Sequence, residues 1–593
     1  MKASNFEIKD LLADNTNLTF LVGAGCSVDA PSCLPAGRSM IEAIIDHTCA
    51  ESEHEILKKS QELRFEQLIE IFRDLFDHYL KIIDYYELCK IPNLIHFFLA
   101  DMIKKGQFVM TTNFDFLIEL ALLQSGVPKE EIIPVITEND FKRYGNPSKL
   151  IKKGKKPIYK IHGSSRNIIT GEETRDSLIA TIQAFGSNKE GLSVFQIEPF
   201  KAPLFKNISS DRSLVVMGYS GSDDFDIVPT LKNLKDLTNI FWFNHKNDDD
   251  GREKIFKYNI NSIQPSSSLE KTDQILIDIF QMNHVKSIFR IDANTQRFIK
   301  IVLGFELNTT SDKFKIDISN WLTKNIKMPD DNYSKFLIPS TIYHDLYKYD
   351  HALRCNKLIY DNVKKSGDLY PQIISMVNMG GLFGKQENFP EALKWYEEAL
   401  QIVEKQYDFG LQAKILNNMG VIYHRQAKVQ KSLDLYQRAY QIFIKLNDWK
   451  EQARSLLLIG GIEMEMEQYQ NAFNTFRYAL HLIEKSGDLE TKADILFKIG
   501  YIYEIIGNYG EARKEFREAL NIYENLHKHL KKGQVLAHIG GIYHDQKNYK
   551  KALEFYGEAF QIYEDLGLGD SEEVKHIRTN ELLARSHSDR HLI

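Results

Sequence analysis

Residues 500–519 read GYIYEIIGNYGEARKEFREA, and the pattern of this stretch recurs along the C-terminal part of the chain. Its glycine, two alanines and phenylalanine have counterparts at one constant interval, the interval from Gly460 to Gly500. The four columns are Gly380, Gly420, Gly460, Gly500 and Gly540; Ala392, Ser432, Ala472, Ala512 and Ala552; Tyr396, Tyr436, Phe476, Phe516 and Tyr556; and Ala399, Ala439, Ala479, Ala519 and Ala559. Four columns in phase over five copies predict a solenoid of stacked helical repeats.

Each copy has the pattern of two helices joined by a short turn. We expect the small residues to lie where the two helices approach closely, and the aromatic residues to fill the spaces between helix pairs. The order of small residue, aromatic residue and alanine resembles the tetratricopeptide repeat. That family has a usual period of about 34 residues, so the longer period here predicts longer helices. The resemblance implies a concave surface that binds a protein or peptide; a scaffold that only assembles the protein is the alternative.

A degenerate copy precedes the five regular ones. Ser340, Tyr343, Ala352 and Ile359 fall at the phases of the repeat, but Asn356 stands where the regular copies have an aromatic residue. End copies are atypical because one of their faces lacks a neighbour. We therefore expect a capping repeat here, and about six copies in total.

The N-terminal half has a different pattern, in which short apolar runs alternate with helical stretches. Nearly continuous apolar runs are typical of parallel strands that are buried on both faces. We predict an α/β domain with a Rossmann-type parallel sheet, in which ligands bind beyond the carboxyl ends of the strands. The predicted strands are LTFLVG (18–23), QFVMTT (107–112), PIYKIHG (157–163), SLVVMGY (213–219) and NIFWFN (239–244).

Polar residues or glycines follow each of these strands. The segments are GAGCS (23–27), TTNFD (111–115), HG (162–163), GYSGSD (218–223) and Asn244. Each has a structural explanation when taken alone, because glycine forms turns and asparagine or aspartate caps helices. The first is also an incomplete dinucleotide-binding motif, with Val28 at the position of its last glycine. Five such ends on one sheet favour a binding site.

The five segments, in this order, resemble the sirtuin family. The resemblance covers about 290 residues and implies NAD as the substrate of this domain. It implies that Asn113 and His162 are catalytic, with His162 facing the nicotinamide ribose as the general base. Asp115 would surround the nicotinamide pocket together with Asn113. The residues implied to bind the rest of the nucleotide are Ala24, Gly25, Ser27, Gly218, Ser220 and Asn244.

The chain departs from protein-deacetylating sirtuins at two points. No cysteine lies between Gly163 and Gly218, where those enzymes carry a zinc module, and Thr112 replaces their glutamine. We therefore expect no metal. Zinc-free sirtuin-like domains fused to other modules resemble NAD hydrolases of bacterial antiphage defence. That resemblance implies depletion of NAD in abortive infection, with the repeats as the sensor or regulator of a phage or host protein trigger.

Two other functions stay open. One is an NAD-dependent protein deacylase or ADP-ribosyltransferase, which needs an acceptor substrate. The other is a non-catalytic scaffold that binds NAD or ADP-ribose. Because an unregulated NAD hydrolase would kill its host, we expect an inactive resting form, controlled by a partner or by assembly into a homo-oligomer.

Composition sets further limits. The chain has 593 residues and a net charge of −6, so we expect several domains and no general affinity for nucleic acid. No apolar run reaches the length of about 18 residues that a transmembrane helix needs, and the five cysteines form no regular framework. A cytoplasmic protein is therefore expected. The predicted domains are a catalytic domain (1–290), a helical connector (291–332), the repeats (333–572) and a capping helix with tail (573–593).

Overall fold

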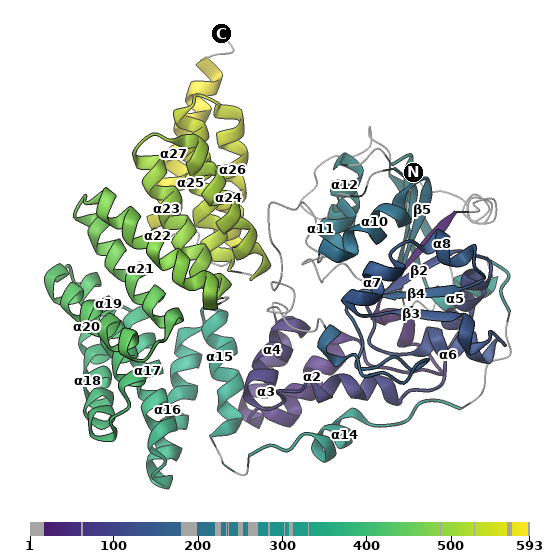
Figure 1. The fold of residues 1–593 in the computed structure, drawn as a ribbon, viewed down its shortest axis with the longest axis horizontal. Coiled ribbons are helices and arrows are strands. Elements are labelled where there is room, and N and C mark those ends of the chain that lie inside the picture. The colour runs from purple at the N-terminus through teal and green to yellow at the C-terminus, as the bar shows by residue number, and fades with distance from the viewer. Residues whose placement is uncertain are drawn as a thin grey trace. The chain divides into compact units, whose positions relative to one another are not determined.

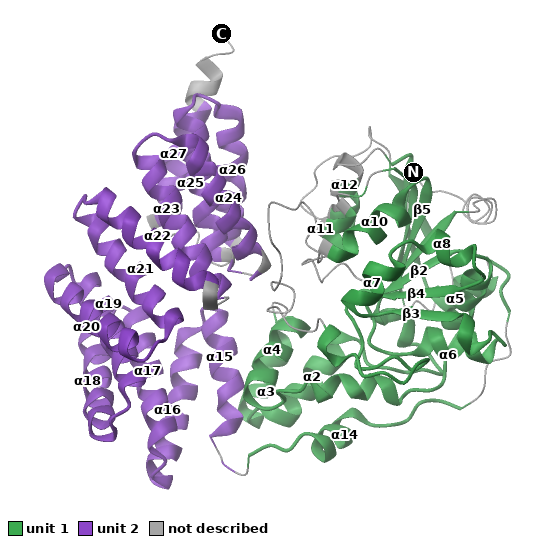
Figure 2. Ribbon diagram, in the orientation of Figure 1, with its two compact units in different colours: residues 1–330 green, residues 331–593 purple. Residues whose placement is uncertain are grey.

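The computed structural model divides the chain into two compact units, Met1–Asp330 and Asp331–Ile593 (Figures 1 and 2). The first unit is an α/β domain and the second is entirely helical, which confirms the predicted fold class. No helix in the described part of the chain is long and apolar enough to cross a membrane. The structure describes residues 17–60, 63–178, 199–219, 227–232, 234, 236–246, 253–258, 271–282, 285–301, 303–306, 312–329, 331, 333–486, 488–526, 528–565 and 572–590.

Within the described residues, the first unit is built on an eight-stranded sheet in the order β3-β4-β2-β1-β5-β6-β8-β7. All neighbouring strands are parallel except β7 and β8. Strand β1 lies within the sheet, between β2 and β5. Strands β2 to β4 lie on one side of it and strands β5 to β8 on the other, so the strand order reverses direction at β1. The strands are β1 (Leu18–Val22), β2 (Phe108–Thr111), β3 (Ile132–Val135), β4 (Lys156–Lys160), β5 (Arg212–Met217), β6 (Leu237–His245), β7 (Lys254–Tyr258) and β8 (Ser287–Ala293).

Helices cover both faces of this sheet. Phe20 packs on one face with α5, α6 and α13, whereas its neighbour Leu21 packs on the other face with α7, α10, α11 and α12. Successive strand residues point to opposite faces, so apolar residues at every position give a core on each side. The helices are α2 (Gly37–Thr48), α3 (Glu51–Lys59), α4 (Phe65–Leu75), α5 (Leu94–Lys104), α6 (Leu117–Gln124), α7 (Glu138–Tyr144), α8 (Pro147–Ile151), α10 (Ala202–Ser209), α11 (Ile227–Lys232), α12 (Lys271–Met282), α13 (Thr295–Ile301) and α14 (Ile318–Asn325).

Three strands were absent from the sequence-based prediction. Strand β3 is only four residues long and contains Pro134, a residue that is depleted in strands. Strands β7 and β8 follow the last of the five predicted strands, and β8 spans residue 290, where the catalytic domain was predicted to end.

The second unit is a stack of helix pairs that follows the period of the sequence repeat (Figure 1). Its regular helices have 17 or 18 residues. They are α15 (Leu337–Asp345) with α16 (Tyr349–Ser366), α17 (Leu369–Lys385) with α18 (Phe389–Gln406), α19 (Phe409–Arg425) with α20 (Val429–Lys445), α21 (Trp449–Glu465) with α22 (Tyr469–Ser486), α23 (Leu489–Ile505) with α24 (Tyr509–Asn525), α25 (His529–Asp545) with α26 (Tyr549–Asp565), and α27 (Glu572–Arg590).

The glycine and aromatic columns meet inside each helix pair. A Cβ atom on the glycine of any regular copy would lie 2.4–2.8 Å from the aromatic ring of the same copy, closer than real Cβ atoms come. The expectation that the aromatic residues fill the spaces between pairs was therefore wrong in this respect. The ring of the second helix packs directly on the backbone of the first, which is why the column holds glycine.

The first copy replaces this contact with a polar one. Asn356, in the aromatic column, donates from its side-chain amide to the hydroxyl of Ser340, in the glycine column, at 2.6 Å. Both residues are buried. Asn378 of the next copy in turn donates to the amide oxygen of Asn356 at 3.3 Å. The hydrogen bond links the two helices at the point where the other copies use ring packing.

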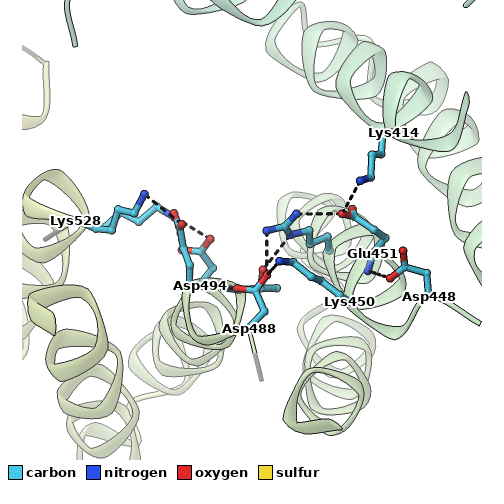
Figure 3. Close-up of polar contacts among 11 residues, drawn as sticks. Lys414, Asp448, Lys450, Glu451, Asp488, Asp494 and Lys528 are labelled. Atoms are coloured by element: carbon cyan, nitrogen blue, oxygen red, sulfur yellow. Dashed lines mark hydrogen bonds and ion pairs between the residues drawn. The ribbon is translucent and has the colours of Figure 1, made fainter. Parts of the chain in front are cut away.

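Ion pairs connect the first helices of successive copies (Figure 3). They join α19 to α21, α21 to the start of α23, and α23 to α25. The side chain of Asp488, one member of these ion pairs, is only 9% exposed. The pairs are Lys414–Glu451 at 3.5 Å, Arg454–Asp488 at 3.0 Å and Lys531–Asp494 at 2.7 Å.

Candidate functional site

The carboxyl ends of five parallel strands lie in one row at an edge of the sheet. In the strand register, Val22 of β1 pairs with Thr111 of β2 on one side and with Met217 of β5 on the other. Thr111 in turn pairs with Lys160 of β4, and Met217 pairs with Phe243 of β6. The segments after these strands, which supply the candidate site residues, therefore begin at the same edge, beside the point where the strand order reverses.

The glycine-rich turn after β1 packs against the turn after β5. The N–H of Gly25 donates to the carbonyl of Gly218 at 2.8 Å, so this N–H is engaged within the protein. A Cβ on Gly25 would lie 2.9 Å from the Cα of Gly218, and Gly218 has a left-handed φ of +65°. Only glycine allows two backbones to approach this closely. Ala24 is exposed at the tip of this turn, in the short 3₁₀ helix η1 (Ala24–Ser27).

A buried hydrogen-bond network joins the segment after β1 to the segment after β2. The hydroxyl of Ser27 donates to the Asp115 carboxylate at 2.7 Å, and the Asn113 side-chain amide donates to both Ser27 and Asp115 at 3.3 Å. The second carboxylate oxygen of Asp115 accepts the N–H of Leu117 at 3.0 Å. Both oxygens of Asp115 are therefore bound by protein donors, and the carboxylate fixes the side chains of Ser27 and Asn113.

The side-chain oxygen of Asn113 is buried and has no hydrogen-bond partner among the described residues. Asn113 itself is 7% exposed. A buried acceptor without a donor costs about 1–3 kcal/mol, so native proteins rarely keep one unless it serves a ligand or a water molecule. This oxygen is an acceptor of the kind that a ribose hydroxyl would satisfy.

His96 of α5 completes the network, and the sequence analysis had not identified it. Its Nδ1 accepts the backbone N–H of Asn93 at 3.1 Å, so the ring proton is on Nε2, which lies 3.1 Å from the Ser27 hydroxyl. A chain of donors thus runs from His96 through Ser27 to Asp115. Burial lowers the pKa of His96 to about 4, against the opposing effect of Asp115. His96 is therefore a neutral donor at physiological pH.

His162 lies directly beyond β4 and is 6% exposed. Thr111 and Lys160 are paired, so Asn113 and His162 each stand two residues beyond paired positions on neighbouring strands. The turn that carries His162 is closed by a hydrogen bond from the N–H of Gly163 to the carbonyl of Lys160 at 3.1 Å. Gly163 has a φ of +75°, and a Cβ there would lie 2.0 Å from the carbonyl oxygen of Ser177.

The strand-end asparagine of β6 lies beside an acidic residue. Asn244 donates from its amide to Asp292, at the end of β8, at 3.1 Å. Arg290 holds both carboxylate oxygens of Asp292, at 2.7 and 2.8 Å. Asn244 is thus held at the same edge as Gly218, and Ser220 lies outside the described residues.

Arg38, at the start of α2, contacts the end of α3. Its guanidinium donates to the carbonyls of Lys58 and Ser60 and pairs with Glu42 at 3.4 Å. Among the described residues, no group of three or more His, Cys, Asp or Glu side chains is arranged to hold a metal ion.

Two family models match parts of the chain. The SIR2-like domain model matches residues 107–263, which include Asn113, Asp115, His162, Gly218 and Asn244. The tetratricopeptide repeat model matches the overlapping stretches 370–445, 411–485, 451–525 and 491–565. The chain combines a SIR2-like domain with tetratricopeptide repeats. SIR2-like domains use NAD, and tetratricopeptide repeats are protein-interaction modules.

No curated protein matches the chain. Similar solved structures include BtubC (BKLC) from P. vanneervenii, with 17% identity, a TM-score of 0.31, and coverage of 38% of this chain and 91% of that one. A Rap protein complexed with competence and sporulation factor has 18% identity and a TM-score of 0.33, over 46% of this chain and 82% of that one. Aspartyl phosphate phosphatase F from Bacillus subtilis has 16% identity and a TM-score of 0.33, over 46% of this chain and 74% of that one.

Proposed function

We propose that the SIR2-like domain hydrolyses NAD to nicotinamide and ADP-ribose. The observation that carries the proposal is the buried, unpartnered amide oxygen of Asn113 at the edge where the glycine-rich turn and the His162 turn also begin. The Asn113 amide nitrogen is already bound by Ser27 and Asp115. Its orientation is therefore fixed before a ligand binds, with the oxygen available to accept a hydroxyl proton of the ribose or of water.

Hydrolysis breaks the bond between the nicotinamide nitrogen and ribose C1′, joins the oxygen of water to C1′ and releases one proton. In this proposal Asn113 orients the ribose or the attacking water, and the imidazole of His162 accepts the proton. An imidazole suits this role because its ordinary pKa is near working pH. Asp115 acts indirectly, because both of its oxygens are bound by the protein.

Contacts of the segment before the repeats support a regulatory role for that segment. The N–H of Phe314 donates to the carbonyl of Pro31 at 2.9 Å, and Pro31 belongs to the loop that continues from the glycine-rich turn. Tyr85 donates to the carbonyl of Ile316 at 2.6 Å and packs edge-on against Trp321 of α14. A conformational change in the connector would therefore reach the loop that follows Ser27.

We further propose that the hydrolase is an effector of antiphage defence, which depletes NAD and aborts the infection. A constitutively active enzyme would kill its host, so the resting protein is inactive. A phage or host protein bound by the repeats, or assembly into a homo-oligomer, activates it. Tetratricopeptide repeats support this role because they are protein-interaction modules.

The test measures NAD in cells that express the full chain, with and without phage challenge. Wild type should lose NAD only after challenge, and Asn113→Ala and His162→Ala should keep it. Loss of a catalytic acid–base group typically costs about 100-fold or more in rate. Asn239→Ala is the matched control. Asn239 lies at the end of β6 away from the candidate site, and its side-chain amide donates to the hydroxyl of Ser213.

The proposal would be overturned if NAD stayed constant in every challenged sample. It would also be overturned if cells with His162→Ala remained protected against the phage. Purified protein separates the reaction classes. A hydrolase releases nicotinamide and ADP-ribose from NAD alone, whereas a deacylase or ADP-ribosyltransferase requires an added acceptor. Binding of NAD without turnover under all conditions would indicate a scaffold.

A further inference from the structure

Lys160 is a fully buried lysine at the end of β4, two residues before His162. Its ammonium group donates to the backbone carbonyl of Asp115 at 2.5 Å and lies 3.4 Å from the carboxylate of Glu119. It also lies 4.9 Å from the centre of the Phe116 ring. A buried charge is stable only when it is paired and hydrogen-bonded, and these three groups, all on the segment after β2, meet that need.

The same residue also holds the His162 turn. The backbone carbonyl of Lys160 accepts the N–H of Gly163 at 3.1 Å, which closes the turn. Its side chain meanwhile fixes the Asp115 carbonyl, and Asp115 in turn fixes the amide of Asn113. Lys160 therefore has contacts to both turns, through its backbone to one and its side chain to the other.

Packing alone does not account for a lysine at this position. Apolar side chains of similar volume in place of both Lys160 and Glu119 would fill the space without the cost of burying two charged groups. What an apolar residue cannot do is donate a hydrogen bond to the Asp115 carbonyl. Burial raises the pKa of Glu119, and the charge of Lys160 opposes that effect, so the two groups depend on each other.

We infer that Lys160 is a positioning residue for the proposed reaction, which fixes the Asn113 segment relative to His162 through the Asp115 carbonyl. Because its side chain is fully buried, Lys160 acts through Asp115 and not by contact with the substrate. The inference rests on the proposed function for its consequence in catalysis. Its structural part, the fixing of the segment after β2, can be tested without turnover.

The experiment compares three variants of the full chain. Glu119→Gln keeps the lysine and its bond to Asp115. Lys160→Met combined with Glu119→Gln removes both buried charges, so that neither is left uncompensated and the fold is kept. Lys156→Met is the control, because Lys156 lies at the other end of β4 and its ammonium group donates to the backbone carbonyl of Lys104.

The first measurement is hydrogen exchange in the segment 112–119, which includes the Leu117 amide bound to Asp115. The double variant should exchange faster in this segment alone, and faster there than Glu119→Gln, which keeps the hydrogen bond to the Asp115 carbonyl. Lys156→Met should exchange as wild type does. Faster exchange throughout the first unit would show that Lys160 is a general core residue. Unchanged exchange in 112–119 would also overturn the inference.

The second measurement is the steady-state kinetics of NAD turnover by the activated protein. A displacement of about 1 Å can cost about 100-fold in rate, so the double variant should lose that factor in kcat with KM changed less than about threefold. A normal kcat in the double variant would overturn the inference. If wild type itself turns over no NAD, the proposed function fails, and hydrogen exchange alone decides the role of Lys160.

Discussion

Gly460 of α21 and Phe476 of α22 are in such close contact that a Cβ on the glycine would lie 2.5 Å from the phenylalanine ring. The adjacent Gly461 has no neighbouring atom within 4 Å of the position that its Cβ would take. The two glycines share a helix and a sequence context but differ in what they face. Their substitution by alanine therefore separates the cost of a steric clash with the ring from the general effect of glycine in a helix.

Gly460→Ala should destabilise the repeat unit by about 1–3 kcal/mol, because the added methyl group overpacks the ring. Gly461→Ala should stabilise it by up to about 1 kcal/mol, because alanine has the higher helix propensity. Urea unfolding of both variants, monitored by circular dichroism, measures the two changes. Equal effects would show that the ring contact has no part in the stability of the repeat.

Substitutions of Asn356 and Ser340, which share a buried hydrogen bond, should have coupled effects on stability. Asn356→Phe alone should destabilise the first copy by about 1–3 kcal/mol, because the ring would meet the serine side chain. Ser340→Gly added to it restores the glycine–aromatic pair of the regular copies and should recover most of the loss. A double-mutant cycle measures the coupling, and additive effects would contradict the prediction.

His96 should make the stability of the first unit depend on pH. Its folded pKa of about 4 lies below its unfolded value of 6.5, so between these values the unfolded chain binds the proton more tightly. The unfolding free energy should fall by about 3 kcal/mol as the pH drops from 6.5 to 4. His96→Gln, which keeps a donor toward Ser27, should weaken this dependence. Hydrogen exchange in β1, corrected for intrinsic rates, measures it; an unchanged slope in the variant would contradict the prediction.

Asp488 should contribute stability through its charge. Burial raises the pKa of its carboxyl, but the hydrogen bonds from Lys450 and from the N–H of Thr491 and the charge of Arg454 outweigh burial, so the pKa lies below its ordinary value. This stability is present above the unfolded pKa of about 4 and is lost as the pH falls through the folded value. Asp488→Asn keeps a cap for α23 and should cost about 1 kcal/mol at pH 7.

The control for this prediction is Asp448→Asn, the equivalent cap one copy earlier. Asp448 accepts the N–H of Glu451 at 3.1 Å, as Asp488 accepts that of Thr491. Its substitution should change stability by less than that of Asp488, and the difference between the two variants should shrink in acid. Thermal unfolding at pH 7 and pH 3 provides the comparison. A difference as large at pH 3 as at pH 7 would count against a role for the charge.

The repeat could be predicted because its residues act locally. Gly460 and Phe476 lie on consecutive helices, and the same pair recurs at the same spacing in every regular copy, so the period alone identifies the contact. The sequence did not indicate that the ring lies within the pair rather than between pairs. That distinction depends on helix rotation, which small and aromatic residues at fixed spacing do not determine.

The candidate site could be predicted only in part. Polar residues at strand ends indicated Asn113 and His162, because parallel strands bring their carboxyl ends to one edge. His96 was missed because it lies in an apolar helix, where its spacing resembles that of core residues. Asn93 followed three residues later by a polar side chain suggests a helix start, but not contact with Ser27, which is 69 residues away. Strand β3 was missed because it is only four residues long and contains Pro134.

The constant period of the second unit has a consequence for how this protein can change over generations. Each helix pair contains its own glycine–aromatic contact, and the pairs recur at one constant interval, so excision of one full period, such as 449–488, would bring α20 next to α23 with every remaining pair complete. A single unequal recombination between copies can thus lengthen or shorten the array without disrupting its packing. The array can therefore gain or lose an entire helix pair in one generation, whereas point substitutions alter its surface one side chain at a time.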